Sequence, residues 1–64
     1  MRITAFRALM AEEFGRVRSE TIARDHVFSE LEGLTVDQAL EAGVPTRTIW
    51  RVVCEAFDVP VERR

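Results

Sequence analysis

The sequence predicts an all-α protein, a compact bundle of three to four short helices whose last two form a helix-turn-helix-like corner. Three observations support this prediction. Apolar residues recur three and four positions apart, no segment alternates with a period of two, and glycine or proline bounds each apolar run. A chain of 64 residues is long enough for one domain, which we expect to span residues 1–64.

The first expected helix runs from Thr4 to Phe14. The hydroxyl of Thr4 can accept a hydrogen bond from a free N–H group of the first turn, so we expect Thr4 to be the N-cap. Gly15 can adopt the left-handed conformation that ends a helix. The apolar face of this helix consists of Phe6, Leu9, Met10 and Phe14.

The second expected helix runs to Leu31 and is ended by Gly33. Its first residue is left open, because Ser19 is a candidate N-cap but the helix can also begin at Val17 or Arg16. Since nothing here alternates, we expect no strand in this segment or elsewhere. The apolar face consists of Ile22, Ala23, Val27 and Leu31, with Phe28 at its margin.

The third expected helix is short and runs from Val36 to Ala42, with Gly43 ending it. Thr35 and Gln38 have the spacing of a capping box, in which each side chain bonds to the backbone N–H of the other residue. We therefore expect this helix to begin directly after Thr35.

The fourth expected helix begins at Pro45 or Thr46 and ends at Phe57. Proline suits the first turn, where its missing N–H would have no partner, and Pro60 prevents the helix from continuing. The apolar faces of all four helices together predict the core: Phe6, Leu9, Met10, Phe14, Ile22, Ala23, Val27, Leu31, Leu40, Ile49, Val53 and Phe57.

The composition argues against several functions. Apolar residues make up 47% of the chain, and a domain this small needs nearly all of them for its core. We therefore expect no deep pocket, no small-molecule substrate and no cofactor. The net charge of −2 argues against a generally basic nucleic-acid binder, although all nine basic residues are arginines suited to carboxylate or phosphate.

The expected compartment is the cytoplasm. Cys54 is the single cysteine, so the chain has no internal disulfide of the kind that small secreted domains usually need. The first residues lack the apolar run of a signal peptide, and no stretch approaches the ~18 apolar residues of a membrane span. We expect no contact with a membrane.

Six runs of residues carry a resemblance to a known family: MRITAF at 1–6, FG at 14–15, IARDHV at 22–27, ALEAGV at 39–44, IWRVVC at 49–54 and AFDVP at 56–60. Together they resemble the small actinobacterial proteins of domain-of-unknown-function family 3046, over essentially the whole chain. The resemblance implies a helical protein of similar length. Because genes of this family often lie beside those of a DNA recombinase and its regulator, it also implies a link to DNA recombination or regulation. It implies no activity and no site.

Residues 35–53 resemble the helix-turn-helix of bacterial repressors. The small Ala39 lets two helices approach closely, and Gly43 permits a sharp turn between them. The outer face of the second helix would then meet a DNA groove. The candidate DNA-binding residues are Thr46, Arg47, Thr48, Trp50 and Arg51.

Three observations oppose DNA binding. Gln38 and Leu40 reverse the polarity that repressors usually show at these positions, and Asp37 and Glu41 bring negative charge beside the reading face. A firm complex neutralises about 6–10 phosphates, whereas the reading helix has two arginines. More positive charge would require convergence of Arg2, Arg7, Arg16 and Arg18. The alternative is that the two helices form a compact corner with no role in DNA binding.

Trp50, Arg51 and Arg47 are the candidate partner-binding residues, because tryptophan and arginine are enriched at the energetic centres of protein interfaces. The alternative is that Trp50 fills the edge of the core, with its indole N–H bonded to a carbonyl. The exposure of the Trp50 side chain distinguishes these two interpretations.

The sequence predicts no catalytic residues and no metal site. Asp25 and His26 are neighbours that point about 100° apart on a helix, so they cannot form a catalytic hydrogen bond. We expect His26 to lie at the core boundary, where Glu30 can reach it from the next turn. His26 and Cys54 together are fewer than the three or four ligands that zinc needs, and Cys54 is expected to be a buried apolar residue.

We therefore expect a non-enzymatic protein-interaction module that binds another protein through the surface containing Trp50, Arg51 and Arg47. The alternative is a DNA-binding helix-turn-helix-like protein linked to DNA recombination or regulation.

Overall fold

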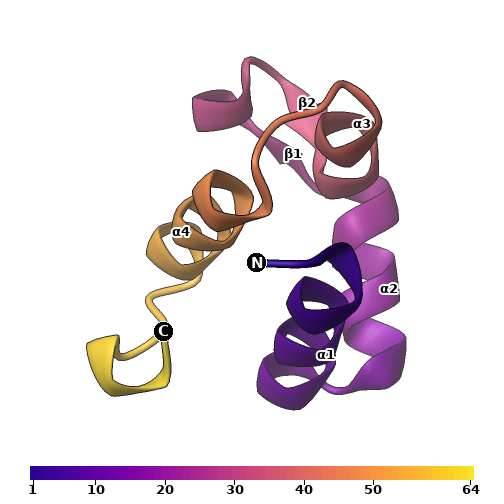
Figure 1. The fold of residues 1–64 in the computed structure, drawn as a ribbon. Helices are drawn as coiled ribbons and strands as arrows, with labels where there is room; N and C mark the ends of the chain where they lie inside the picture. Colours follow the sequence, from indigo (N-terminus) through magenta and orange to yellow (C-terminus); the bar gives the residue numbers. More distant parts are fainter.

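Four helices and one small hairpin make up the chain, which a computed structural model describes over residues 1–64 (Figure 1). The helices are α1 (Ile3–Phe14), α2 (Arg16–Asp25), α3 (Val36–Glu41) and α4 (Thr46–Ala56). The antiparallel strands are β1 (Val27–Phe28) and β2 (Leu34–Thr35), and single 3₁₀ turns cover Ser29–Leu31 and Val61–Arg63. The predicted helical bundle is confirmed, but the hairpin corrects the all-α class.

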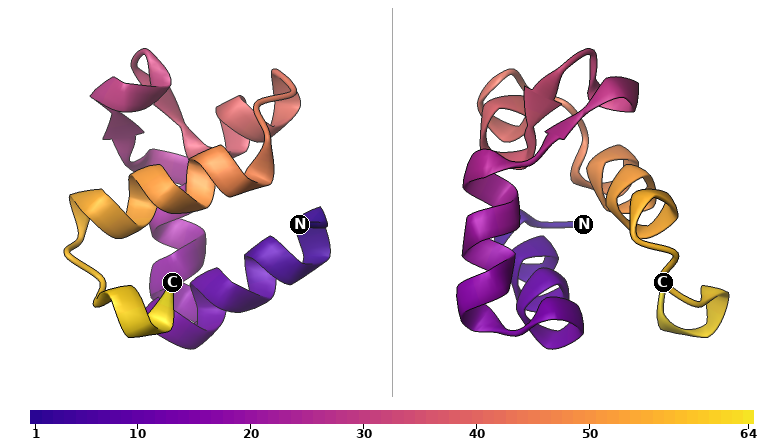
Figure 2. Two further views of the ribbon diagram at one scale, coloured as in Figure 1. Left: turned by 60° about the vertical axis from the view of Figure 1, so that its left-hand side comes forward. Right: turned by 180° about the vertical axis from the view of Figure 1, so that it is seen from behind.

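The arrangement places α4 on one side of the molecule and α2 on the other (Figures 1 and 2). The hairpin and α3 lie at one end between them, and α1 lies at the other. The N-terminus is held against the start of α4, where the Thr46 hydroxyl donates to the Met1 carbonyl oxygen at 2.6 Å. No helix has both the length and the apolar character needed to cross a membrane.

The helix boundary at Gly15 and the start of the second helix at Arg16, one of the alternatives left open, are confirmed, but Thr4 and Ser19 are not N-caps. Helix α1 begins at Ile3 and has no side-chain cap, so Thr4 lies inside it. Gly15 adopts a φ of 84°, which lets α2 begin at the next residue. Ser19 is therefore already within the helix, where its buried hydroxyl donates to the Arg16 carbonyl at 2.9 Å.

The hairpin replaces the predicted last turns of the second helix. Helix α2 ends at Asp25, and β1 and β2 then pair with Val27 opposite Thr35 and Phe28 opposite Leu34. Glu32 and Gly33, with φ angles of 58° and 81°, form the left-handed turn that brings the chain back. Strands of two residues are too short to show an alternating pattern, so sequence periodicity cannot reveal them.

The change from helix to strand also reverses which residue is buried. Successive strand residues point to opposite faces, so Phe28 turns into the core with 2% of its surface exposed, whereas Val27 is 56% exposed. The prediction of Val27 as a core residue is therefore wrong, and Phe28 takes its place.

The second half of the chain agrees with prediction. The capping box is present: Thr35 Oγ1 accepts from the Gln38 N–H at 3.2 Å, and Gln38 Oε1 accepts from the Thr35 N–H at 2.9 Å. Gly43, with a φ of 85°, lies in the turn after α3, and α4 begins directly after Pro45.

The core gathers side chains from every helix and the hairpin. Leu9, Phe14, Leu40 and Phe57, which are predicted core residues, are partly buried at its edge. The fully buried cluster consists of Phe6, Met10, Ile22, Ala23, Phe28, Leu31, Val36, Ala39, Ile49, Trp50, Val52, Val53, Cys54 and Val59.

Candidate functional site

Trp50 lies in the core, with 4% of its surface exposed. Its ring meets Phe6 edge to face, with ring centroids 6.2 Å apart and planes at 83°. The carbonyl partner expected for a buried indole is missing, because Nε1 is buried without an acceptor. Of the three candidate partner-binding residues, Trp50 is thus turned inward, while Arg47 and Arg51 remain exposed.

The outer side of α4 brings together three of the five candidate DNA-binding residues. Arg47, Thr48 and Arg51 line one open surface hollow of about 280 Å³. Arg51 also pairs with Glu55 at 3.7 Å across one helical turn. Thr46 is separate from this group, since its hydroxyl binds the N-terminal backbone.

The acid–histidine neighbours are separated by the end of α2. Asp25 accepts from Arg24 at 3.2 Å, and Glu30 accepts from the Ser29 hydroxyl. The expected approach of Glu30 to His26 is therefore wrong: the His26 side chain forms no hydrogen bond, and its ring packs against Phe28 at a centroid distance of 4.5 Å.

Cys54 is fully buried, and that burial raises the pKa of its thiol. A buried thiol with a raised pKa is a poor nucleophile, because the thiolate is the reactive form. Neither Cys54 nor His26 lines any of the hollows on the molecule. No three side chains of the types that ligate metals converge on one point.

The largest hollow, about 580 Å³, is an open groove between α1 and the C-terminal tail. A two-point ion pair crosses it: Arg63 donates to Glu13 through Nε at 2.9 Å and through Nη2 at 3.1 Å. This hydrogen-bonded guanidinium lowers the pKa of the Glu13 carboxyl. The groove is lined by Leu9, Glu12, Glu13, Glu62, Arg63 and Arg64.

A different surface combines aromatic rings with free nitrogen donors. Phe14, at the end of α1, meets Phe57, directly after α4, edge to face at 5.3 Å, and both rings are partly exposed. The guanidinium of Arg18 on α2 lies 5.8 Å from the first ring centroid and 6.0 Å from the second. These distances are within the range of a cation–π contact.

His26 extends this surface beside Phe57. Its exposed ring lies 5.2 Å from that of Phe57 and covers the buried Phe28 beneath it. Neither Arg18 nor His26 forms an ion pair or a side-chain hydrogen bond within the chain. We call this surface the aromatic–arginine face and define it by Phe14, Arg18, His26 and Phe57.

Sequence patterns alone do not reveal the aromatic–arginine face, because its members come from four separate segments. Phe14 and Phe57 have the spacing of core residues, and Arg18 contributes only to the general positive charge. Phe14 and Arg18 are four residues apart, which is the spacing of neighbours on a helix. However, Gly15 interrupts the helix between them, so this spacing does not predict their contact.

Fold and surface together define a small, mostly helical domain with an exposed cluster of aromatic and basic side chains and no enclosed reactive centre. The chain matches the family described as "Protein of unknown function (DUF3046)" over residues 1–62 and belongs to that family. No curated protein and no solved structure matches it.

Proposed function

We propose that this protein is a non-enzymatic protein-interaction module and that it contacts its partner through the aromatic–arginine face. The observation that carries the proposal is the Arg18 guanidinium, which lies within cation–π distance of two partly exposed phenylalanine rings and has no acceptor of its own. This surface replaces the Trp50 side of α4 as the centre of the interaction, because the indole is buried.

Physical chemistry favours such a surface for binding. Aromatic and arginine side chains dominate the energetic centres of interfaces, because they bury a large apolar area and still offer directed hydrogen bonds. The rings of Phe14 and Phe57 are held in place by each other and by the core, so little side-chain entropy is lost when a partner covers them.

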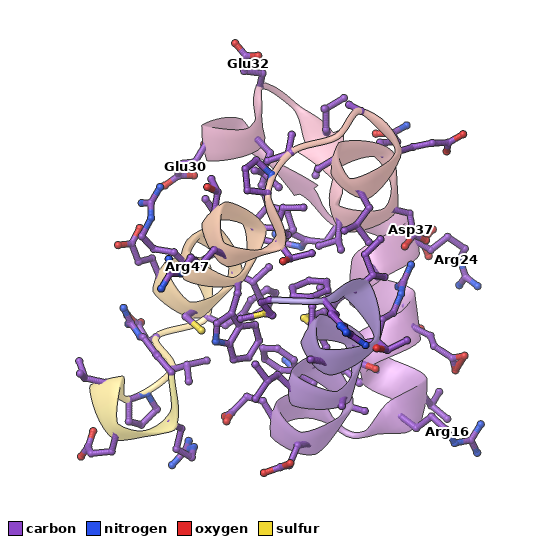
Figure 3. The ribbon with its side chains drawn as sticks, in the orientation of Figure 1. Arg16, Arg24, Glu30, Glu32, Asp37 and Arg47 are labelled. Carbon is purple, nitrogen blue, oxygen red and sulfur yellow. The ribbon has the colours of Figure 1, made fainter.

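A capture experiment with two matched charge reversals tests the proposal. The tagged protein, Arg18→Glu and Arg16→Glu are used to recover partners from a lysate of the source organism. Both arginines are exposed on α2 and neither has a carboxylate partner, but Arg16 does not contact the aromatic rings (Figure 3 shows it pointing outward). We expect Arg18→Glu to reduce recovery about tenfold and Arg16→Glu to leave it unchanged. Equal recovery by both variants would contradict the proposal.

The second candidate is DNA binding through α4, favoured by the shared hollow of Arg47, Thr48 and Arg51. Two guanidinium groups and a hydroxyl are suitable phosphate ligands. Against it, Arg51 is partly neutralised by Glu55, and Arg7 is engaged by Asp37 at 2.9 Å, so it adds no free charge. A gel-shift assay with random duplex at about 50 mM salt tests this function, since non-specific binding is strongest at low salt. A shift lost in Arg47→Glu would support it, and no shift would exclude it.

A further inference from the structure

We propose that the aromatic–arginine face binds an acidic segment of a partner protein, which places a carboxylate against Arg18 and His26 and an apolar side chain against Phe14 and Phe57. This inference rests on the proposed function and adds the chemistry of the partner. The inference rests on a comparison of the arginines that pair with carboxylates within the chain and the one on this face that does not.

Four arginines already have carboxylate partners inside the chain. Arg7 pairs with Asp37, Arg24 with Asp25, Arg51 with Glu55 and Arg63 with Glu13. Two of these pairs use an acid next to a residue of the face, Glu13 beside Phe14 and Asp25 beside His26, but each of those acids is already bonded to its own arginine. The acids that form them are therefore not available to the face.

Arg18 differs from those four arginines. Its guanidinium carbon lies 5.8 Å and 6.0 Å from two ring centroids, while its N–H groups have no acceptor in the chain. Contact with two rings favours this position of the side chain, and a guanidinium that is already positioned loses less entropy when it forms a further bond. The acceptor that best fits the geometry of its paired N–H groups is a carboxylate.

His26 supplies a second free donor against the same ring of Phe57. An imidazole always carries at least one N–H, and neither ring nitrogen of His26 is bonded within the chain. A carboxylate near Phe57 can thus accept from Arg18 or from His26.

The phenylalanine rings favour an acidic protein over a DNA duplex. Phe14 and Phe57 are partly exposed next to the donors, and covering them favours binding only if the partner also brings apolar surface. A protein segment with an acidic residue beside an aliphatic or aromatic one provides both groups. A duplex backbone provides the anion without the apolar group, and one arginine neutralises too few phosphates to hold it.

The probe for this inference is a library of random short peptides selected against the full chain at neutral pH and about 50 mM salt, where screening of charges is weak. Arg18→Glu serves as the counter-selection, so that only peptides dependent on the aromatic–arginine face are kept. We expect the retained peptides to be rich in aspartate or glutamate adjacent to leucine, isoleucine or phenylalanine.

The three outcomes separate the inference from the function on which it rests. Peptides that combine acidic with apolar residues and that require Arg18 for binding would support both the acidic partner and the protein-binding function. Retained peptides that are neutral or basic would overturn the acidic partner but leave a protein-binding face. If no retained peptide depends on Arg18, both the inference and the proposed function are wrong.

A quantitative test uses one retained peptide in calorimetry. Arg18→Gln keeps most of the side chain but removes the charge, and we expect it to weaken binding about tenfold. Changing the peptide's glutamate to glutamine should weaken binding of the natural chain by a similar factor, but should have little further effect on Arg18→Gln. Independent, additive losses would mean that Arg18 does not contact the carboxylate, which would contradict the inference.

Discussion

The two aromatic regions of this protein contain similar residues and differ in what surrounds them. On the inner side of α4, Trp50 packs against Phe6 and both are closed off from solvent. At the aromatic–arginine face, Phe14 and Phe57 pack together just as directly, but they remain partly open and carry Arg18 and His26 on top. One region stabilises the fold, and the other is the surface that we propose contacts a partner.

The difference shows that composition along one helix does not define a surface. Trp50 and Arg51 are sequence neighbours, but adjacent helix positions point about 100° apart, so one is buried and the other exposed. Arg18 and Phe57 are far apart in sequence but meet in space. A tryptophan beside an arginine therefore indicates an interface only when both lie on the same face.

The largest effect that separates the two regions concerns Cys54, which lies one helical turn beyond Trp50. Because the thiol is buried and its pKa is raised by that burial, we expect a thiol reagent to react only through opening of the fold. The rate should be about a thousandfold below that of the urea-unfolded chain, in line with the weaker end of small-domain stability. Below the ordinary thiol pKa, raising the pH should speed the folded and unfolded chains by the same factor, because both react as the thiolate of an opened chain. Equal rates would mean that the inner side of α4 is open.

The next largest effect is the loss of folding stability when an aromatic ring is removed from each region. Phe6→Ala removes a fully buried ring and should cost about 3–5 kcal/mol, enough to unfold much of the population of a small domain. Phe57→Ala removes a partly exposed ring and should cost about half as much or less. The exposed Val27→Ala is the control, expected to change stability by less than about 0.5 kcal/mol. Urea unfolding followed by circular dichroism measures all three, and equal losses for the two phenylalanines would remove the distinction between the regions.

A smaller effect is expected for Trp50→Phe. The substitution leaves a small cavity, which destabilises the protein, but it also removes a buried N–H group that has no acceptor. These terms oppose each other, so we expect a net change of less than about 1 kcal/mol in the free energy of unfolding. A loss as large as that of Phe6→Ala would show that the indole N–H does have an acceptor, such as a bound water.

The smallest expected effect on stability comes from the ion pair between Arg63, in the C-terminal tail, and Glu13. Arg63 lowers the pKa of Glu13 in the folded chain, so this pair stabilises the fold above the normal carboxyl pKa and stops doing so as the pH falls through the lowered value. NMR titration of the Glu13 carboxyl should give a midpoint below the ordinary value for glutamate. In Arg63→Ala the Glu13 midpoint should rise toward the ordinary range. An unchanged midpoint in that variant would assign the shift to another cause.

Local signals in the sequence predict most of the fold. The capping box of Thr35 and Gln38, the helix end at Gly15 and the start of α4 after Pro45 each depend on residues a few positions apart. The hairpin is not predictable in this way. It depends on pairing between β1 and β2 and on the left-handed turn at Glu32, and these features are stabilised by burial of Phe28 and Leu31 in the common core.

The candidate site is harder to predict from the sequence, because most of it depends on contacts between residues that are distant in the chain. Arg47, Thr48 and Arg51 follow one another on a single helix, and they do share one hollow. The aromatic–arginine face joins the end of α1, the first turn of α2, the residue between α2 and β1 and the end of α4, so only tertiary packing brings its members together.

The most direct test compares two charge reversals on a partner that the natural chain binds, with dissociation constants measured side by side. Arg18→Glu lies on the aromatic–arginine face and Arg51→Glu on the outer side of α4, and both arginines are exposed. We predict that binding weakens at least about tenfold for Arg18→Glu and stays close to the natural value for Arg51→Glu. Weakened binding by Arg51→Glu with Arg18→Glu unaffected would contradict the account and return the interaction to α4.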